Sequence, residues 1–231
     1  GYVTAAKRLI RHELAGRVPL IGFSGSPWTL ATYMVEGQSS SDFARIKQMV
    51  YDAPATAHQL LKVLSDSVSI YLTAQAHAGA QVLMIFDTWG GVLAHADYQH
   101  FSLEPMEQII GHLRADPIAS DLPIIVFTKG GGQWLARMAA TGCDALGCDW
   151  TSSLREARHQ VQDRVALQGN LDPAILYASP DRVRTAVADV LEDFGPGPGH
   201  VFNLGHGVTP GVDPDQVKVL VDAVHELSRT G

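Results

Sequence analysis

The sequence predicts an α/β fold in which parallel strands alternate with helices, and three observations support this. Six short apolar runs rich in branched residues each close on polar or glycine residues: residues 19–25, 81–88, 123–130, 145–150, 164–170 and 200–207. Several of these runs are continuously apolar and do not alternate with polar residues, which is typical of strands covered on both faces. Helical patterns separate the runs, so successive strands are connected by crossovers and must be parallel.

The helices are indicated by apolar residues at spacings of three and four and by capping residues. The clearest stretch spans residues 55–77, and Pro54 suits its first turn. Asp213 and Pro214 supply an N-cap and a first-turn proline for the last helix. A further helix over residues 3–14 precedes the first strand, and two helices are expected between the first and second strands. The order is therefore one helix followed by six βα units.

Polar residues at every strand end favour a closed barrel over an open sheet. The strand ends contain Ser24 and Ser26, Asp87 and Thr88, Lys129, Asp149, Gln168 and Asn170, and Asn203 and His206. A barrel gathers such residues at one mouth, whereas an open sheet concentrates its chemistry at one switch point and often has a glycine fingerprint after the first strand, which is not found here.

The predicted fold class is therefore a TIM-type (β/α)8 barrel. Such a barrel needs eight strands and six are counted, while the chain begins with the helix that would follow a strand. We expect the first two βα units to be missing from this chain. Residues 1–231 are then a single domain, made of the C-terminal six βα units of the barrel.

Composition excludes several classes of protein. The 17 basic and 24 acidic residues give a formal charge of −7, which is the wrong sign for broad contact with nucleic acid. No apolar run approaches the ~20 residues that a membrane span needs. The two cysteines lack the spacing of a zinc site, and no secretory pattern opens the chain, so we expect a cytoplasmic protein without bound metal.

Four strand-end features are candidates for chemistry. His206 lies between two glycines after the last strand, where a bent backbone would present its side chain. Tyr33 could offer a phenolic hydrogen bond or could pack in the core. Either Asp87 or Thr88 could reach a ligand, and the sequence does not decide between them. Lys129 could form a Schiff base, bind a carboxylate or be structural.

Four blocks of sequence resemble uroporphyrinogen decarboxylases over the whole chain. They are GFSGSPWTL at residues 22–30 with YMVEG at 33–37, FDTWGG at 86–91, LQGNLDP at 167–173 and FNLGHG at 202–207. The resemblance implies a (β/α)8 barrel enzyme of heme and porphyrin biosynthesis. It would remove carbon dioxide from the four acetate side chains of uroporphyrinogen III, yielding coproporphyrinogen III. No metal or organic cofactor is implied, and a homodimer joined through the barrel mouths is expected.

The resemblance also assigns residues. Tyr33, Thr88 and His206 match positions at which the family binds its substrate. The family's Arg-Gln-Ala-Gly-Arg block and the aspartate that contacts the pyrrole NH groups do not occur in this chain, so no catalytic residue is assigned. We therefore expect these 231 residues alone to be weakly active or inactive.

Two alternatives remain open. The first is a zinc-dependent, cobalamin-linked methyltransferase of the same fold, which would hold zinc with a His-x-Cys pair that this sequence lacks. The second is an inactive fragment that binds a tetrapyrrole.

Overall fold

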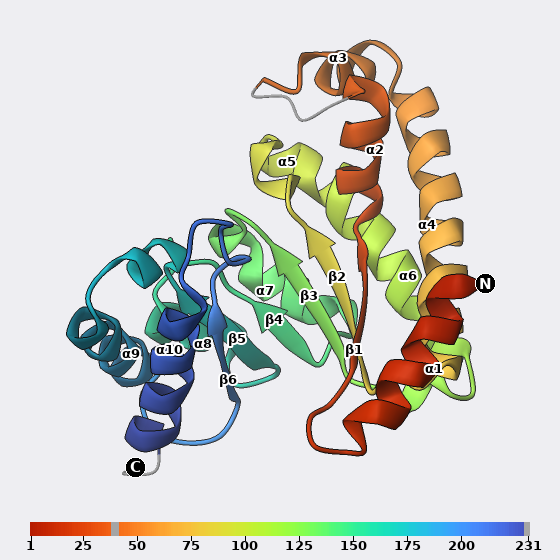
Figure 1. Cartoon of the computed structure of the whole chain (residues 1–231). Helices are drawn as coiled ribbons and strands as arrows, with labels where there is room; N and C mark the ends of the chain where they lie inside the picture. The colour runs from red at the N-terminus through yellow and green to blue at the C-terminus, as the bar shows by residue number, and fades with distance from the viewer. Residues whose placement is uncertain (38–41, 229–231) are drawn as a thin grey trace. The chain divides into compact units, whose positions relative to one another are not determined.

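The computed structural model describes residues 1–37 and 42–228 and divides them into two compact units (Figure 1). Unit 1 contains Gly1–Thr128 and Ala140–Asp144, and unit 2 contains Lys129–Ala139 and the chain from Ala145 onward. In the described ranges, none of the helices is long and apolar enough to cross a membrane.

The described residues of unit 1 form three strands with helices between them. In chain order its elements are α1 (Tyr2–Leu14), β1 (Ile21–Gly25), α2 (Pro27–Glu36), α3 (Ala44–Asp52), α4 (Pro54–His77), β2 (Val82–Asp87), α5 (His95–Tyr98), α6 (Glu104–Ala115) and β3 (Ile124–Thr128). The strands are parallel and pair in chain order, β1 with β2 and β2 with β3. Figure 1 shows α4 and α6 running alongside these strands.

Unit 2 repeats this alternation. Its elements are α7 (Leu135–Met138), β4 (Ala145–Gly147), α8 (Leu154–Val161), β5 (Ala166–Leu171), α9 (Pro180–Phe194), β6 (His200–Leu204) and α10 (Pro214–Leu227). Strand β4 pairs with β5 and β5 with β6, again parallel and in chain order. Helices α9 and α10 enclose an apolar core with Leu171 of β5 and with Phe202 and Leu204 of β6. All six predicted strands are thus confirmed.

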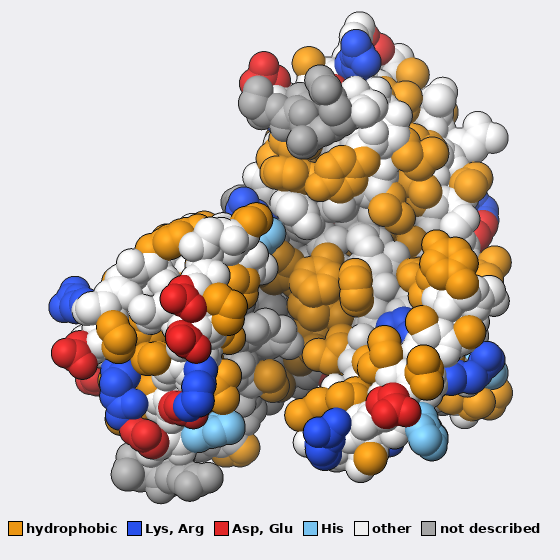
Figure 2. Space-filling view, in the orientation of Figure 1, with side chains coloured by type: hydrophobic (Ala, Val, Ile, Leu, Met, Phe, Trp, Pro, Cys, Tyr) orange, Lys and Arg blue, Asp and Glu red, His pale blue; other side chains and the backbone are white. Residues whose placement is uncertain are grey.

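Two expectations need correction. The described residues between β1 and β2 form three helices, because residues 44–52 make the separate helix α3, which ends at Asp52, two positions before Pro54 starts α4. The expectation that strands are covered on both faces holds for β3 but does not extend to β1 or β6, whose residues alternate in burial. Within unit 1, β1 pairs only with β2, and within unit 2, β6 pairs only with β5, among the described residues. Phe23 of β1 is 57% exposed. Figure 2 shows hydrophobic side chains gathered over β1 and α2.

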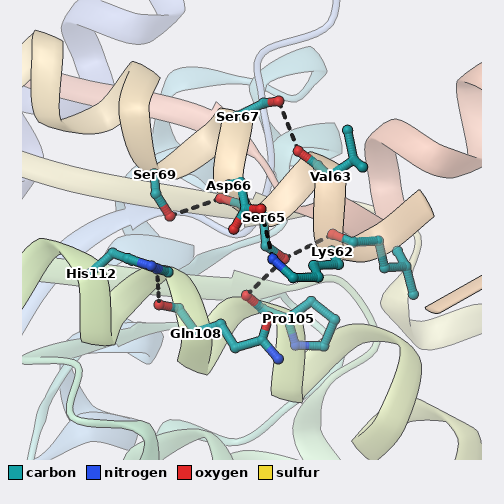
Figure 3. Close-up of polar contacts among 10 residues, drawn as sticks. Lys62, Val63, Ser65, Asp66, Ser67, Ser69, Pro105, Gln108 and His112 are labelled. Atoms are coloured by element: carbon teal, nitrogen blue, oxygen red, sulfur yellow. Dashed lines mark hydrogen bonds and ion pairs between the residues drawn. The ribbon is translucent and has the colours of Figure 1, made fainter. Parts of the chain in front are cut away.

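Small hydroxyl side chains line the contact between α4 and α6. Ser65 Oγ donates to a carbonyl in the preceding turn of α4 and, at 3.4 Å, to the carbonyl of Pro105 in α6 (Figure 3). Ser69 Oγ donates to the carbonyl of Ser65. Because these side chains satisfy their own hydroxyl groups on the helix backbone, they can be buried without unpaired donors. On the solvent side of α4, Lys62 pairs with Asp66.

Candidate functional site

The candidate site residues lie just beyond the carboxyl ends of strands. Thr88 follows β2, which ends at Asp87, and His206 follows β6, which ends at Leu204. Tyr33 lies in α2, the helix after β1. Barrels of parallel strands place binding and catalytic residues at this end. Tyr33 and Thr88 belong to unit 1, and His206 belongs to unit 2.

A buried carboxylate joins the strand ends of unit 1. Asp87 is completely buried and accepts hydrogen bonds from four hydroxyl groups. The donors are Ser26 Oγ at 2.6 Å, Thr29 Oγ1 at 3.1 Å, Ser102 Oγ at 2.6 Å and Thr128 Oγ1 at 3.2 Å. We call these five residues the Asp87 network. Burial raises the pKa of the Asp87 carboxyl above its usual value, and the four hydroxyl donors offset part of that rise.

The Asp87 network ties together elements that are far apart in the sequence. Ser26 is the N-cap of α2, Ser102 lies in a π-helical turn before α6, and Thr128 ends β3. The sequence left open whether Asp87 or Thr88 faces a ligand. Because the Asp87 carboxylate is enclosed by its donors, the half-buried Thr88 is the group that remains available.

The backbone of Trp89, the residue after Thr88, is held on both sides. Its N–H donates to Thr29 Oγ1 at 3.2 Å, and its carbonyl accepts from the Trp28 indole at 2.9 Å. A buried Phe43 side chain packs against the Trp89 ring, with 4.9 Å between the ring centroids. The position of Thr88 is therefore fixed by contacts with α2 and with the segment before α3.

The same tryptophan connects Tyr33 to this loop. The Tyr33 and Trp89 rings meet edge to face, with centroids 6.4 Å apart. Tyr33 is 44% exposed, so it is not the core residue that its type alone would favour, and its phenol can reach solvent or a ligand. The structure thus brings Tyr33 and Thr88 together through Trp89.

A second buried carboxylate organises the strand ends of unit 2. Asp149, which follows β4, accepts hydrogen bonds from the backbone N–H groups of Gly130 and Thr151 and from Thr151 Oγ1, at 2.5 to 2.9 Å. Asn170 Nδ2, on β5, donates to the carbonyls of Asp149 at 2.9 Å and Ser152 at 2.6 Å. These bonds fix the loops after β3 and β4 to β5.

His206 is exposed on a backbone that approaches this loop closely. A Cβ atom at Gly205 would lie 2.6 Å from the backbone nitrogen of Trp150, so the residue before His206 needs to be glycine. Burial lowers the pKa of the His206 imidazole, and the positive charge of Lys129 lowers it further, whereas the Asp149 carboxylate acts in the opposite direction. The neutral imidazole is therefore favoured more strongly than in an ordinary histidine.

Comparison with known proteins identifies the family. The family model described as "Uroporphyrinogen decarboxylase (URO-D)" matches residues 1–227. The chain belongs to the uroporphyrinogen decarboxylase family. A uroporphyrinogen decarboxylase of Thioalkalivibrio sulfidiphilus is 64% identical over 97% of the chain, and one of Alkalilimnicola ehrlichii is 60% identical over 98%. The chain spans 64% and 62% of the length of these two relatives.

Solved structures support the TIM-barrel fold of this family. A methyltransferase from Methanosarcina mazei is similar with a TM-score of 0.82 and 22% identity, covering 98% of this chain and 64% of its own. A B12-independent methionine synthase from Shewanella gives a TM-score of 0.67 at 10% identity, covering 98% of this chain and 65% of its own. At these identities the likeness concerns the fold alone.

The uroporphyrinogen decarboxylase family match does not favour the methyltransferase alternative. Within residues 1–37 and 42–228, no group of three or more His, Cys, Asp or Glu side chains is placed to hold a metal ion.

Two features of the site were not predicted from the sequence. One is the use of Asp87 and Asp149 as buried acceptors that fix neighbouring loops. The sequence does not distinguish such a carboxylate from one that binds a ligand at a strand end. The other is the contact of Phe43 with Trp89, which joins segments more than forty residues apart. The sequence contains no local signal for this contact.

Proposed function

We propose that this chain forms six βα units of a uroporphyrinogen decarboxylase, with residues 1–231 as a single domain. The enzyme removes carbon dioxide from the four acetate side chains of uroporphyrinogen III to give coproporphyrinogen III. The observation that supports this most strongly is the family match over residues 1–227, together with relatives of that name at 60 to 64% identity.

Tyr33, Thr88 and His206 are proposed to bind the substrate. All three are hydrogen-bonding side chains, and a tetrapyrrole with eight carboxylates needs such partners once water is displaced. Tyr33 and Thr88 are linked through Trp89, so they would act on the same part of the substrate. A carboxylate bound to His206 would raise the pKa of its imidazole and favour the protonated form.

The chemistry sets a further requirement. Loss of carbon dioxide from a pyrrole acetate breaks the bond between the methylene carbon and the carboxylate carbon, and protonation of the pyrrole ring creates the electron sink that accepts this electron pair. A proton donor and a group that stabilises the ring cation are therefore needed. We assign neither role to a residue of this chain, whose part is to bind and orient the side chains of the substrate.

We further propose that the protein is a cytoplasmic homodimer that works without a metal or organic cofactor. These proposals follow from membership of the family. Sedimentation-equilibrium measurements of the purified chain, and of the chain joined to the remaining third of a relative, would show whether a dimer forms in each case.

The proposed function is tested by anaerobic conversion of uroporphyrinogen III, with products resolved by the number of carboxylates. The chain alone is compared with a fusion that adds the part of the Thioalkalivibrio sulfidiphilus relative that the chain does not match. We expect the fusion to yield the four-carboxylate product and the chain alone to convert negligible amounts. Conversion by the fusion should fall in the variants Tyr33→Phe, Thr88→Ala and His206→Asn, but not in the surface variant Lys62→Met.

If neither protein converts the substrate but the chain binds porphyrin, the second alternative, an inactive tetrapyrrole-binding protein, is supported. If neither protein converts or binds it, the proposed function is wrong.

A further inference from the structure

Lys129 has a defined place at the strand ends of unit 2 that the substrate-binding residues named above do not use. It follows β3 directly and is half-buried. Its Nζ lies 5.8 Å from the centroid of the Trp150 ring. Trp150 is three positions before Ser153, the N-cap of α8. An ammonium group over the face of an aromatic ring is attracted to that face, and this attraction helps to keep it at a set position.

Asp149 holds the loop that contains Lys129. The carboxylate of Asp149 accepts a hydrogen bond from the N–H of Gly130, the residue after Lys129, and two more from Thr151. Asp149 also adjoins Trp150, against which Lys129 lies. The ammonium group is therefore positioned by its own backbone, by the loop after β4 and by the ring of Trp150.

His206 is within electrostatic range of the same lysine. The positive charge of Lys129 acts on the His206 imidazole, and the charge of Asp149 acts on it with the opposite sign. Two basic groups placed near each other repel when both are charged, and an anion that contacts both removes that repulsion. The Asp149 carboxylate is already engaged by three donors from Gly130 and Thr151, which weakens its ability to serve as that anion.

We propose that Lys129 is a further substrate-binding residue, whose ammonium group pairs with a side-chain carboxylate of the tetrapyrrole beside His206. This inference rests on the proposed function, because the carboxylates of uroporphyrinogen supply the anion. It assigns Lys129 neither a Schiff base nor a proton-transfer role. The residue binds and orients one acetate or propionate group.

The first test is the affinity of the chain for uroporphyrin, the stable oxidised form of the substrate, measured by fluorescence titration. The variant Lys129→Met keeps the aliphatic stem and removes the charge, and it should bind about tenfold more weakly, as expected for one lost charge-assisted contact. Lys129→Arg should recover most of the affinity. Lys218→Met is the matched control, because Lys218 is exposed on α10 of the same unit and pairs with Asp222.

The second test is an NMR titration of His206, whose Cε1–H signal is assigned with His206→Asn. The charged groups that act on His206 are Lys129 and Asp149. In the ligand-free chain, Lys129→Met should raise the pKa of His206, since a repelling charge is lost. Adding uroporphyrin to the wild-type chain should also raise the pKa of His206. The same addition to Lys129→Met should raise the pKa of His206 by less, because the bound carboxylate is held less firmly.

The outcomes separate this inference from the proposed function. If the wild-type chain fails to bind uroporphyrin, the proposed function fails and the inference fails with it. If the wild-type chain binds and Lys129→Met binds equally well, the inference alone is overturned. Circular dichroism checks that Lys129→Met is folded. If Lys129→Met is not folded, Lys129→Gln, which is also neutral, is used in its place.

Discussion

Replacing Asp87 with alanine is expected to destabilise unit 1 by about 4 kcal/mol. The substitution removes the acceptor of four hydroxyl groups, all of them buried. Each buried hydroxyl that loses its acceptor costs about 1–3 kcal/mol, so four give about 4 kcal/mol at the lower value. The lower value is appropriate because the substitution also relieves the cost of burying a carboxylate. Asp87→Asn retains one acceptor oxygen and the side-chain volume, and it should cost only about 1–2 kcal/mol.

The assay is urea denaturation followed by tryptophan fluorescence. Trp28 and Trp89 make the hydrogen bond that adjoins the Asp87 network, so their emission reports on this part of unit 1. The matched control is Asp66→Ala on α4, where an exposed carboxylate pairs with Lys62. An exposed pair of this kind contributes about 0.3–0.5 kcal/mol, so the control should stay close to wild type.

The pH dependence supplies an independent check. Because burial raises the pKa of folded Asp87 above its unfolded value, the folded chain binds this proton more tightly than the unfolded chain. The contribution of Asp87 to stability therefore declines as pH rises between the two pKa values, and the cost of Asp87→Asn should be larger near about pH 4 than near about pH 7. The reasoning is refuted if Asp87→Ala costs less than the control, or if the cost of Asp87→Asn grows with pH.

Three further predictions concern other buried groups. Burial raises the pKa of Cys143, and that of Cys148 to about 12, so neither thiol should react with a disulfide reagent at neutral pH before urea is added; fast labelling of the folded chain would contradict this. Gly205→Ala should weaken uroporphyrin binding at least tenfold in the same titration, because its Cβ would collide with backbone, whereas Gly207→Ala has open space and should bind normally. Burial lowers the pKa of folded His200, so its contribution to stability is lost as pH falls below 6.5; His200→Gln should therefore lose less stability than wild type between about pH 7 and pH 5 in urea titrations, and an equal loss would oppose the argument.

The strands were the most predictable part of the fold, for a physical reason. Buried parallel strands need apolar residues on both faces. Strand β3 is buried at every position, so its continuously apolar sequence clearly predicts a buried strand. The long helix α4 was equally clear, because Pro54 and a periodic apolar stripe mark its start and its buried face. Helix α3 was missed. It buries only Ile46 and Val50, and its N-cap Phe43 makes no capping hydrogen bond, so no start signal precedes it.

The candidate site was predictable to the level of strand ends and no further. Sequence alone placed Thr88 and Asp87 side by side at the end of β2, and successive residues of a strand point to opposite faces. Which of them is enclosed depends on Ser102 and Thr128, which come from later segments of the chain. Such long-range partners leave no trace in the local pattern, so the choice between a ligand-binding and a structural carboxylate required the structure.

The two strand-end carboxylates follow one electrostatic rule that agrees with the proposed substrate. Asp87 and Asp149 are both buried, and both accept hydrogen bonds from hydroxyl or backbone donors of their own unit. An accessible carboxylate at the strand ends would repel a ligand with eight carboxylates, and enclosing it in donors weakens that repulsion. The four residues proposed to bind the substrate are hydrogen-bond donors or bases: Tyr33, Thr88, Lys129 and His206. If the protein instead bound a cation, we would expect the carboxylates to be exposed and the lysine to be absent. If removal of the Lys129 charge reduces the affinity for uroporphyrin and Lys218→Met does not, the result supports the role of Lys129. It also supports the wider distinction between enclosed carboxylates, which fix loops, and donors or bases, which bind the substrate.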